Sequence, residues 1–151
     1  MYARILVPVD GSRASQRGLQ EAIRLTKSLG ARLRLLHVVN EFVLDPGFTP
    51  APLHEPLIAG LREAGKGVLA DSEAAARREG VQVETELLET ISGGVARAIV
   101  QAAQDWQADL IVMGTHGRRG LSRLALGSDA EMVLRTSPVP VLLVREAAEP
   151  A

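Results

Sequence analysis

Short, continuous apolar runs alternate along this chain with longer segments whose apolar residues recur at helical spacing. The first run, Ile5 to Val9, ends at the turn sequence Asp10-Gly11-Ser12, as expected of a strand buried on both faces. Strands separated by single helices pair in parallel through right-handed crossovers, with helices on both faces of one sheet. The pattern therefore predicts an α/β fold: a single-domain, open, doubly wound parallel sheet. The five predicted strands cover residues 5–9, 33–39, 81–88, 109–113 and 139–144.

Four main helices are expected between these strands. Gly30 follows the first apolar stripe as a helix stop, and the second stripe ends before Gly80. The fourth helix runs from about Ser128 to Thr136. The stripes of the first three helices are Leu19, Ala22, Ile23, Thr26 and Leu29; Leu57, Leu61, Ala64 and Val68; and Ala96, Ile99, Val100 and Ala103.

The segment from Asn40 to Pro56 is rich in proline, which excludes regular structure from it. Two interpretations are open. The segment is either a loose surface crossover or a lid over the carboxyl edge of the sheet, in which Phe42 and Phe48 cover a flat ligand or pack on a helix. The four prolines are Pro46, Pro50, Pro52 and Pro56.

Composition narrows the classes of protein. The 151 residues, 46% of them hydrophobic, suit one domain over residues 1–146 with a short tail at 147–151. Seventeen Lys and Arg against 18 Asp and Glu leave a net charge of −1, which predicts no nucleic-acid or membrane partner. Without cysteine there is no disulfide or thiolate nucleophile, and the apolar runs are too short for a signal sequence or a membrane span. A cytoplasmic protein is expected.

A glycine-rich loop follows the predicted fourth strand, where ligands bind in open α/β sheets. It begins at Gly114 and extends to Gly127 and Ser128 at a helix start. Glycines let backbone N–H groups approach phosphate oxygens, and a helix N-terminus adds unpaired donors. The loop holds no acidic residue, which predicts a local anion site. It lacks the lysine of a P-loop, which disfavours a P-loop enzyme. Its cations are Arg118, Arg119 and Arg123.

Simpler roles compete for several of these residues. Ser128 and Glu131 fit an S-x-x-E capping box, and Asp10 fits an Asx turn. The arginines would then be a solvated surface. His116 is more often an exposed side chain than a base, and His37, at the end of a buried strand, is expected to be structural.

The spacing Gly114-x-x-Gly117, nine residues, then Gly127-Ser128 resembles G-x2-G-x9-G-[ST], the nucleotide-binding signature of the universal stress protein family. Four further segments resemble hallmarks of that family, in order. The resemblance implies strand order 3-2-1-4-5 and ATP as ligand. These segments are residues 5–12, 36–38, 109–117 and 138–144.

Carried over by this resemblance, Pro8, Val9 and Asp10 with Val38 would border adenine and ribose. A carboxylate suits that place because it only accepts hydrogen bonds. Met113 and Gly114 would lie beneath the nucleotide, and the loop glycines with Ser128 would hold phosphates. The full expected set is Pro8, Val9, Asp10, Val38, Met113, Gly114, Thr115, His116, Gly117, Arg118, Arg119, Gly127, Ser128, Asp129 and Ala130.

Asp129 affects the choice of nucleotide. A carboxylate beside phosphate is repulsive unless Mg²⁺ lies between them, so ADP or AMP would compete with ATP. Because no general base is evident, the sequence predicts an ATP-binding regulatory protein of the stress response with little or no hydrolysis and no catalytic residue. Two alternatives are a slow Mg²⁺-dependent ATP phosphohydrolase that uses Asp129 and a dimeric interaction module indifferent to nucleotide. The last strand, Val139 to Val144, predicts a homodimer, because a bare apolar edge is usually covered.

Overall fold

The computed structural model is a five-stranded parallel sheet flanked by helices, and it describes residues 1–41, 47–91, 94–116 and 126–146. The strand order is β3-β2-β1-β4-β5, which confirms the predicted α/β fold class, strand order and four helices. The elements are β1 (Arg4–Pro8), α1 (Arg13–Leu29), β2 (Arg32–Asn40), α2 (Ala51–Arg78), β3 (Val83–Thr90), α3 (Gly94–Asp105), β4 (Leu110–Gly114), α4 (Ser128–Thr136) and β5 (Val141–Val144).

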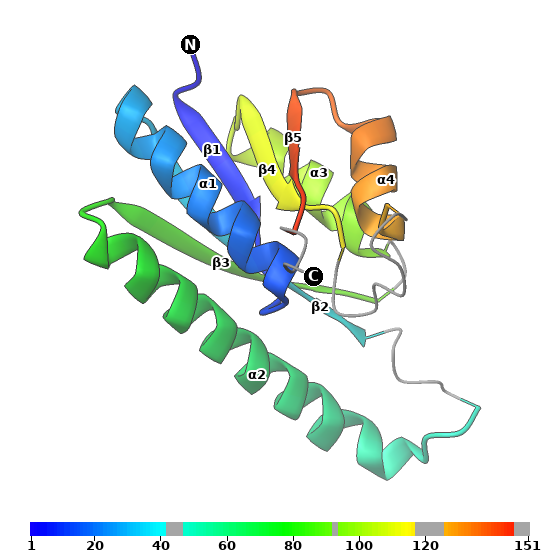
Figure 1. Cartoon of the computed structure of the whole chain (residues 1–151). Helices are drawn as coiled ribbons and strands as arrows, with labels where there is room; N and C mark the ends of the chain where they lie inside the picture. Colours follow the sequence, from blue (N-terminus) through cyan, green and yellow to red (C-terminus); the bar gives the residue numbers. More distant parts are fainter. Residues whose placement is uncertain (42–46, 92–93, 117–125, 147–151) are drawn as a thin grey trace, which may run out of the picture.

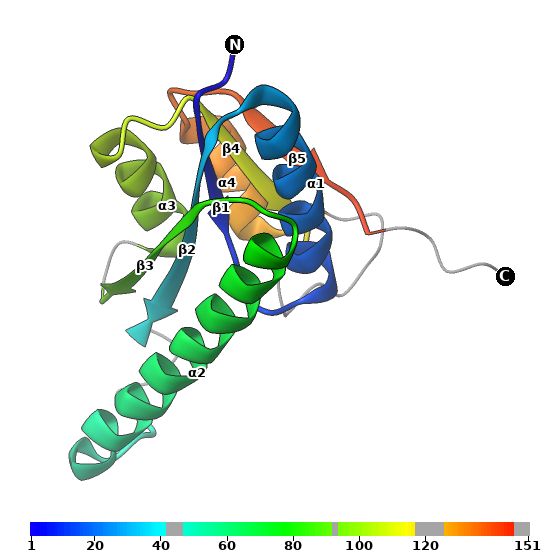
Figure 2. The ribbon, with the colours of Figure 1, turned by 90° about the vertical axis from the view of Figure 1, so that its left-hand side faces the viewer.

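Helices cover both faces of the sheet, with α1 and α2 on one face and α3 and α4 on the other (Figures 1 and 2). Successive residues of β1 enter opposite cores. Ile5 and Val7 pack with α1 and α2, whereas Leu6 packs with α3 and α4. All three side chains are fully buried, as the continuous apolar run predicts for a central parallel strand.

The strand order reverses between β1 and β4, because β2 pairs with one edge of β1 and β4 with the other. At this point α1 lies unusually close to the end of β4. A Cβ atom placed on Gly114 would lie 2.5 Å from the carbonyl carbon and oxygen of Ala14, and one on Gly18 would lie 3.1 Å from the Gly114 nitrogen. Gly114 is therefore required for packing, whatever its role toward a ligand.

The ends of α1 follow the predicted signals. Ser12 caps the first turn, since its side chain accepts a hydrogen bond from the Ser15 N–H. Gly30 ends the helix in the left-handed conformation, with φ 64°, and its N–H donates to the Thr26 carbonyl. The predicted glycine stop is confirmed.

The proline-rich segment differs from its prediction, since α2 already begins at Ala51. Pro52 lies in the first turn, where the backbone N–H has no intrahelical partner, so it is compatible with a helix start. Pro56 lies inside the helix. The expectation of no regular structure as far as Pro56 is therefore wrong. Phe48 is 89% exposed and packs on no helix, and Phe42 lies outside the described residues.

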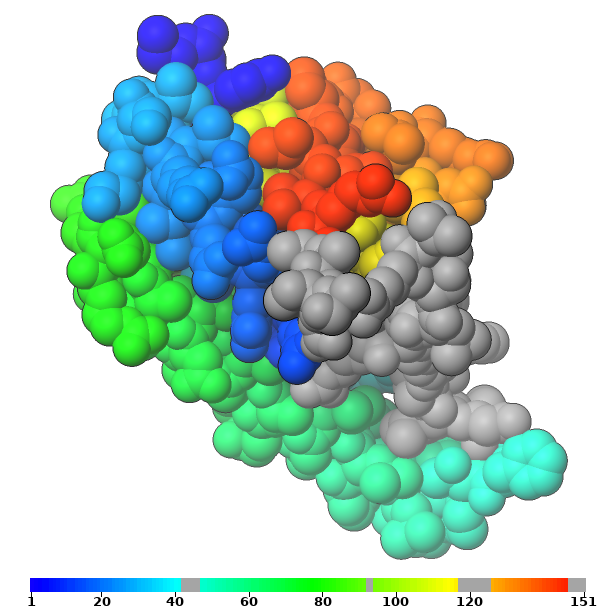
Figure 3. Space-filling model, in the orientation of Figure 1, coloured from blue at the N-terminus to red at the C-terminus, as the bar shows by residue number. Residues whose placement is uncertain are grey.

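None of the four residues of the predicted stripe of α2 is fully buried. Leu57 and Ala64 are exposed and Leu61 and Val68 are half-buried, whereas the buried positions of the helix are Gly65, Leu69 and Ala76. The first turns of the helix extend beyond the carboxyl ends of the strands (Figure 2) and reach the rim of the molecule in the space-filling view (Figure 3). In the part of the chain that the structure describes, even this 28-residue helix is not apolar enough to cross a membrane, and no other helix is.

Candidate functional site

Most of the predicted nucleotide-binding residues lie at the carboxyl edge of the sheet, around the point where strand order reverses. Pro8 ends β1, and Met113 with Gly114 ends the neighbouring β4. Val9 remains tied to β2, because its N–H donates to the Leu36 carbonyl at 2.8 Å, two residues before Val38. Three strands therefore present their predicted residues at one edge. Gly117, Arg118 and Arg119, like Arg123, lie outside the described residues.

Asp10 forms the Asx turn that its sequence context predicts. Its Oδ1 accepts a hydrogen bond from the Ser12 N–H at 2.9 Å. The other carboxylate oxygen, Oδ2, makes no hydrogen bond to any residue that the structure describes. The turn thus uses one carboxylate oxygen of Asp10 and leaves the second without a hydrogen-bond donor among the described residues.

Two side chains outside the predicted set hold the peptide group between Val9 and Asp10. The His37 ring nitrogen Nδ1 lies 2.7 Å from the Val9 carbonyl oxygen, and the Asp10 N–H donates to Ser15 Oγ at 3.1 Å. Both residues are polar positions next to buried apolar ones in the sequence. The pattern marks them as unusual. The pairing of β1 with β2 brings His37 to Val9, and the first turn of α1 brings Ser15 to Asp10.

The two ends of the glycine-rich loop are joined by a hydrogen bond. The Gly127 N–H donates to the Thr115 carbonyl at 2.7 Å, and the Thr115 N–H donates to the Val144 carbonyl at 3.1 Å. His116 follows Thr115 and is half-buried. The Gly127 N–H is therefore already used within the protein, which leaves the amides that follow it in α4 as donors.

The start of α4 carries these donors. Gly127 is the N-cap residue and makes no side-chain capping bond, so the capping box predicted for Ser128 and Glu131 is wrong. Glu131 pairs instead with Arg135, at 2.9 Å. The N–H groups of the first three helical residues precede the first intrahelical bond, and none of them has a hydrogen-bond partner among the residues that the structure describes. The Ser128 hydroxyl, too, has no hydrogen-bond partner among the described residues. These first residues are Ser128, Asp129 and Ala130.

Two carboxylates influence each other across this edge. Desolvation raises the pKa of Asp129, and the negative charge of Asp10 raises it further. Such a pair attracts cations and repels an unshielded phosphate. In the described ranges no three His, Asp or Glu side chains come together as a metal site. The two carboxylates therefore suit Mg²⁺ only with oxygen ligands supplied by a bound phosphate or by water.

We expect the substitution Asp10→Asn to bring the pKa of Asp129 back toward its ordinary value of 3.8. Because the pKa is raised in the folded state, the folded protein binds more protons than the unfolded chain just above pH 3.8. Stability is therefore lost as the pH rises through the interval between the two values. Asp10→Asn should reduce that loss.

Carboxyl-carbon NMR titration measures this pKa, and urea unfolding over the same pH range measures the stability. The control is Asp71→Asn, an exposed carboxylate on α2. An Asp129 pKa that is the same in wild type and Asp10→Asn would contradict the coupling.

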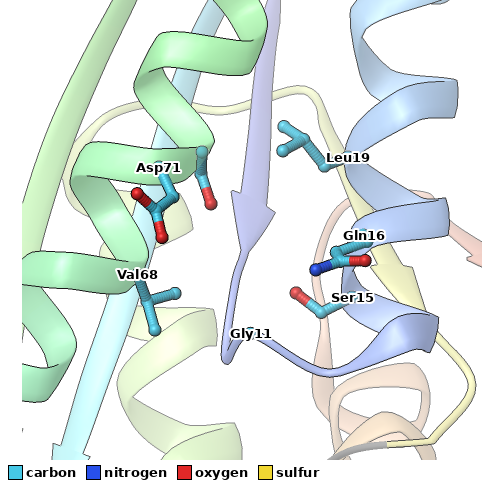
Figure 4. Close-up of a pocket in the computed structure, with 7 residues that line it drawn as sticks. Gly11, Ser15, Gln16, Leu19, Val68 and Asp71 are labelled. Atoms are coloured by element: carbon cyan, nitrogen blue, oxygen red, sulfur yellow. The ribbon is translucent and has the colours of Figure 1, made fainter.

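A separate hollow of about 250 Å³ lies between α1 and α2. The Ser15 hydroxyl and the Gln16 amide point toward it from α1, and Asp71 lies on its α2 side (Figure 4). None of the predicted nucleotide-binding residues lines it, so it is not the predicted site. The lining residues are Gly11, Ser15, Gln16, Leu19, Val68, Asp71 and Ser72.

The fold and the edge geometry together define a doubly wound α/β domain with a candidate ligand site at the switch point of the sheet. Its donors lie at a helix N-terminus and its free acceptor at the end of β1. The model of the universal stress protein family matches residues 1–145. The chain belongs to this family.

Individual relatives resemble the chain along nearly its whole length. It is 38% identical over 148 residues to Universal stress protein MJ0531 of Methanocaldococcus jannaschii, covering 97% of this chain and 84% of that one. The structure of hypothetical protein MJ0577 superposes with a TM-score of 0.84 at 28% identity, and 99% of each chain is covered. The structure of the universal stress protein from Archaeoglobus fulgidus in complex with dAMP superposes with a TM-score of 0.66 at 25% identity, covering 95% of this chain and 98% of that one.

Proposed function

We propose that this protein binds an adenine nucleotide, ATP or its products ADP and AMP, and acts as a nucleotide-dependent regulator in the stress response. The observation that carries the proposal is the pairing of donors and acceptor at the switch point. The start of α4 offers unpaired N–H groups and the Ser128 hydroxyl, and β1 ends at Asp10 with a free carboxylate oxygen. The solved relative with bound dAMP supports an adenine nucleotide as the ligand.

In this proposal the nucleotide spans the edge from β2 to α4. Pro8, Val9 and Val38 border the base, and the free oxygen of Asp10 accepts a hydrogen bond from ribose or adenine. Met113, Gly114, Thr115 and His116 lie beneath the ligand. The phosphates meet the N–H groups of residues 128–130, together with Gly117, Arg118 and Arg119 of the loop. Gly127 contributes as a residue without a side chain, because its own N–H is bonded to Thr115.

Mg²⁺ bound to the phosphates, with Asp129 as a further ligand, would offset the repulsion between that carboxylate and phosphate. Hydrolysis is proposed to be slow or absent, since the sequence offers no evident general base beside the phosphates. The position of Asp129 on α4 favours one alternative, a slow Mg²⁺-dependent phosphohydrolase. Release of phosphate over many turnovers would establish that alternative.

Mass spectrometry of small molecules released from protein purified without added nucleotide tests the proposal. We expect an adenine nucleotide, and isothermal titration of the stripped protein should return its affinity. Absence of any retained nucleotide together with no measurable binding would favour the nucleotide-independent interaction module instead. The proposed domain spans residues 1–146, with 147–151 as a tail, and its proposed place of action is the cytoplasm, where adenine nucleotides are available.

A homodimer through the last strand, predicted for residues 139–144, is part of the proposal. β5 is an edge strand of the sheet. Among the strands that the structure describes it pairs with β4 alone, and its Leu142 is 37% exposed. An apolar edge left bare invites pairing with another strand, and Pro140 limits open-ended growth. Pairing of two β5 edges about a two-fold axis would cover both.

We expect Leu142→Glu to shift the protein from dimer to monomer in sedimentation equilibrium at micromolar concentration. Val144 is unsuitable for this test, because it packs against the core formed with α1 and α2. The control is Leu53→Glu, a 51% exposed position on α2. A monomeric wild-type protein would contradict the proposed dimer.

A further inference from the structure

The peptide group that joins β1 to Asp10 is held by a side chain on each side. The Val9 carbonyl lies 2.7 Å from His37 Nδ1, and the Asp10 N–H donates to Ser15 Oγ at 3.1 Å. Because a peptide group is planar, fixing its oxygen and its N–H fixes the direction in which the chain leaves the strand. That direction sets where the Asp10 carboxylate lies.

The His37 ring is the donor in the first of these bonds, since a carbonyl oxygen only accepts. Nδ1 therefore carries a hydrogen. The ring projects from β2, is half-buried, and lies between the end of β1 and helix α2. Displacement of the ring would leave the Val9 carbonyl without this donor.

Helix α2 passes over the ring at Gly65. A Cβ atom at this position would lie 2.5 Å from His37 Cδ2 and 3.0 Å from Nε2, so a larger residue cannot fit unless the ring moves. Gly60 and Gly67 of the same helix differ, because a Cβ atom there would meet nothing within 4 Å. Gly65 is thus the glycine of α2 that close packing requires.

A second contact holds α2 at this place. Arg62, one turn before Gly65, forms an ion pair with Glu89 in the last part of β3. It also contacts Glu55 at 2.9 Å. The part of α2 that presses on the ring is therefore anchored to the sheet near its carboxyl edge.

We propose that His37 is a positioning residue of the nucleotide site, which holds the Val9 carbonyl, and that the packing of Gly65 on its ring makes nucleotide affinity depend on the seating of α2. This inference rests on the proposed function, because the affinity in question is that for adenine nucleotide.

Four single variants of the full chain test the inference by titration with ADP and Mg²⁺. His37→Leu keeps an apolar side chain but loses the donor, and should weaken binding roughly tenfold. His37→Asn returns an N–H donor near the position of Nδ1, and should bind within about twofold of wild type. Gly65→Ala should weaken binding severalfold, whereas Gly67→Ala, its matched control, should leave binding unchanged.

The double variant Gly65→Ala with His37→Ala shows whether the two residues act together. If Gly65→Ala acts by displacing the ring, it should have no further effect on ADP affinity once the ring is absent. The Asp10 amide resonance in NMR spectra provides a readout without nucleotide. It should move in His37→Leu and Gly65→Ala and stay in place in Gly67→Ala.

The outcomes separate the two proposals. A wild-type protein that binds no adenine nucleotide would overturn the proposed function and, with it, the effect of His37 on affinity. A wild type that binds ADP, with His37→Leu and Gly65→Ala binding equally well, would overturn the inference alone. His37 would be a packing residue alone if His37→Asn failed to recover ADP affinity and if Gly65→Ala and Gly67→Ala bound ADP equally well.

Discussion

Gly114→Ala is expected to lower the free energy of unfolding by about 3 kcal/mol, because its added Cβ meets the closest backbone contacts among the glycines compared in the described part of the chain. The added Cβ would lie 2.5 Å from backbone atoms of Ala14 and 2.9 Å from its Cβ. Backbone atoms cannot rotate away as a side chain does. The first turn of α1 would have to move away from the end of β4. Gly18, in the next turn of α1, also packs closely on Gly114.

Urea unfolding followed by circular dichroism measures this loss. Gly60→Ala is the matched control, because its Cβ would meet nothing within 4 Å and alanine is the better helix former. A loss below about 1 kcal/mol in Gly114→Ala would show that α1 adjusts easily. The expected loss means that packing alone requires the first glycine of the predicted nucleotide motif.

Asp10→Asn should weaken adenine-nucleotide binding by roughly ten- to a hundredfold, as expected for loss of a hydrogen bond to a charged acceptor. Asparagine keeps one oxygen for the Ser12 N–H and so preserves the Asx turn. It replaces the free Oδ2 by an NH₂ group, which cannot accept from ribose or adenine. The variant therefore separates recognition of the ligand from the shape of the turn.

Isothermal titration with AMP, ADP and ATP compares the variant with wild type. Asp71→Asn, at the hollow between α1 and α2, is the control for loss of one negative charge. If Asp10→Asn bound each of the three nucleotides as tightly as wild type does, Asp10 would not be part of the nucleotide site. A loss of similar size in both variants would point to net charge as the cause.

The sheet was predictable because its signals are local. A continuous apolar run such as Ile5 to Val9 specifies a strand buried on both faces, and single helices between runs specify parallel pairing. The ends of the strands were less predictable, since β3 begins at Val83 rather than Val81 and β5 at Val141 rather than Val139. Val81 is nonetheless buried, so its apolar character reflects packing outside the strand.

Helix α2 shows where local signals fail. Pro52 and Pro56 were read as excluding a helix. Pro52 lies in the first turn, where a proline removes no intrahelical bond, and the helix continues through Pro56 at the cost of one such bond. The predicted stripe included Leu57 and Ala64, which are both exposed. Leu57 lies in the part of the helix that extends past the sheet, whereas Ala64 faces solvent although its neighbour Gly65 packs on His37. How far the helix extends past the sheet depends on the lengths of the helix and the strands after they have packed, which a local sequence pattern does not contain.

The site was predicted as a set of positions, and its hydrogen bonds were predicted less well. The Asx turn of Asp10 follows from a contact two residues away and is confirmed. The capping box was wrong because the helix begins with Gly127 as its N-cap, one residue before the pattern requires. His37 was expected to be structural, and its bond to Val9 arises only when β2 is laid beside β1.

The part of α2 that extends past the sheet can act as a lever arm about the contact between Gly65 and His37. The helix has 28 residues, a length of about 42 Å, whereas the nine residues of β2 reach about 30 Å. Gly65 lies close to the middle of the helix, so the ring of His37 sits at the fulcrum and Ala51 at the end of an arm of about 21 Å. In the coupling proposed above, a sideways force on that arm becomes a torque at the contact with Gly65, and the ring of His37 would pass it to the peptide that carries Asp10.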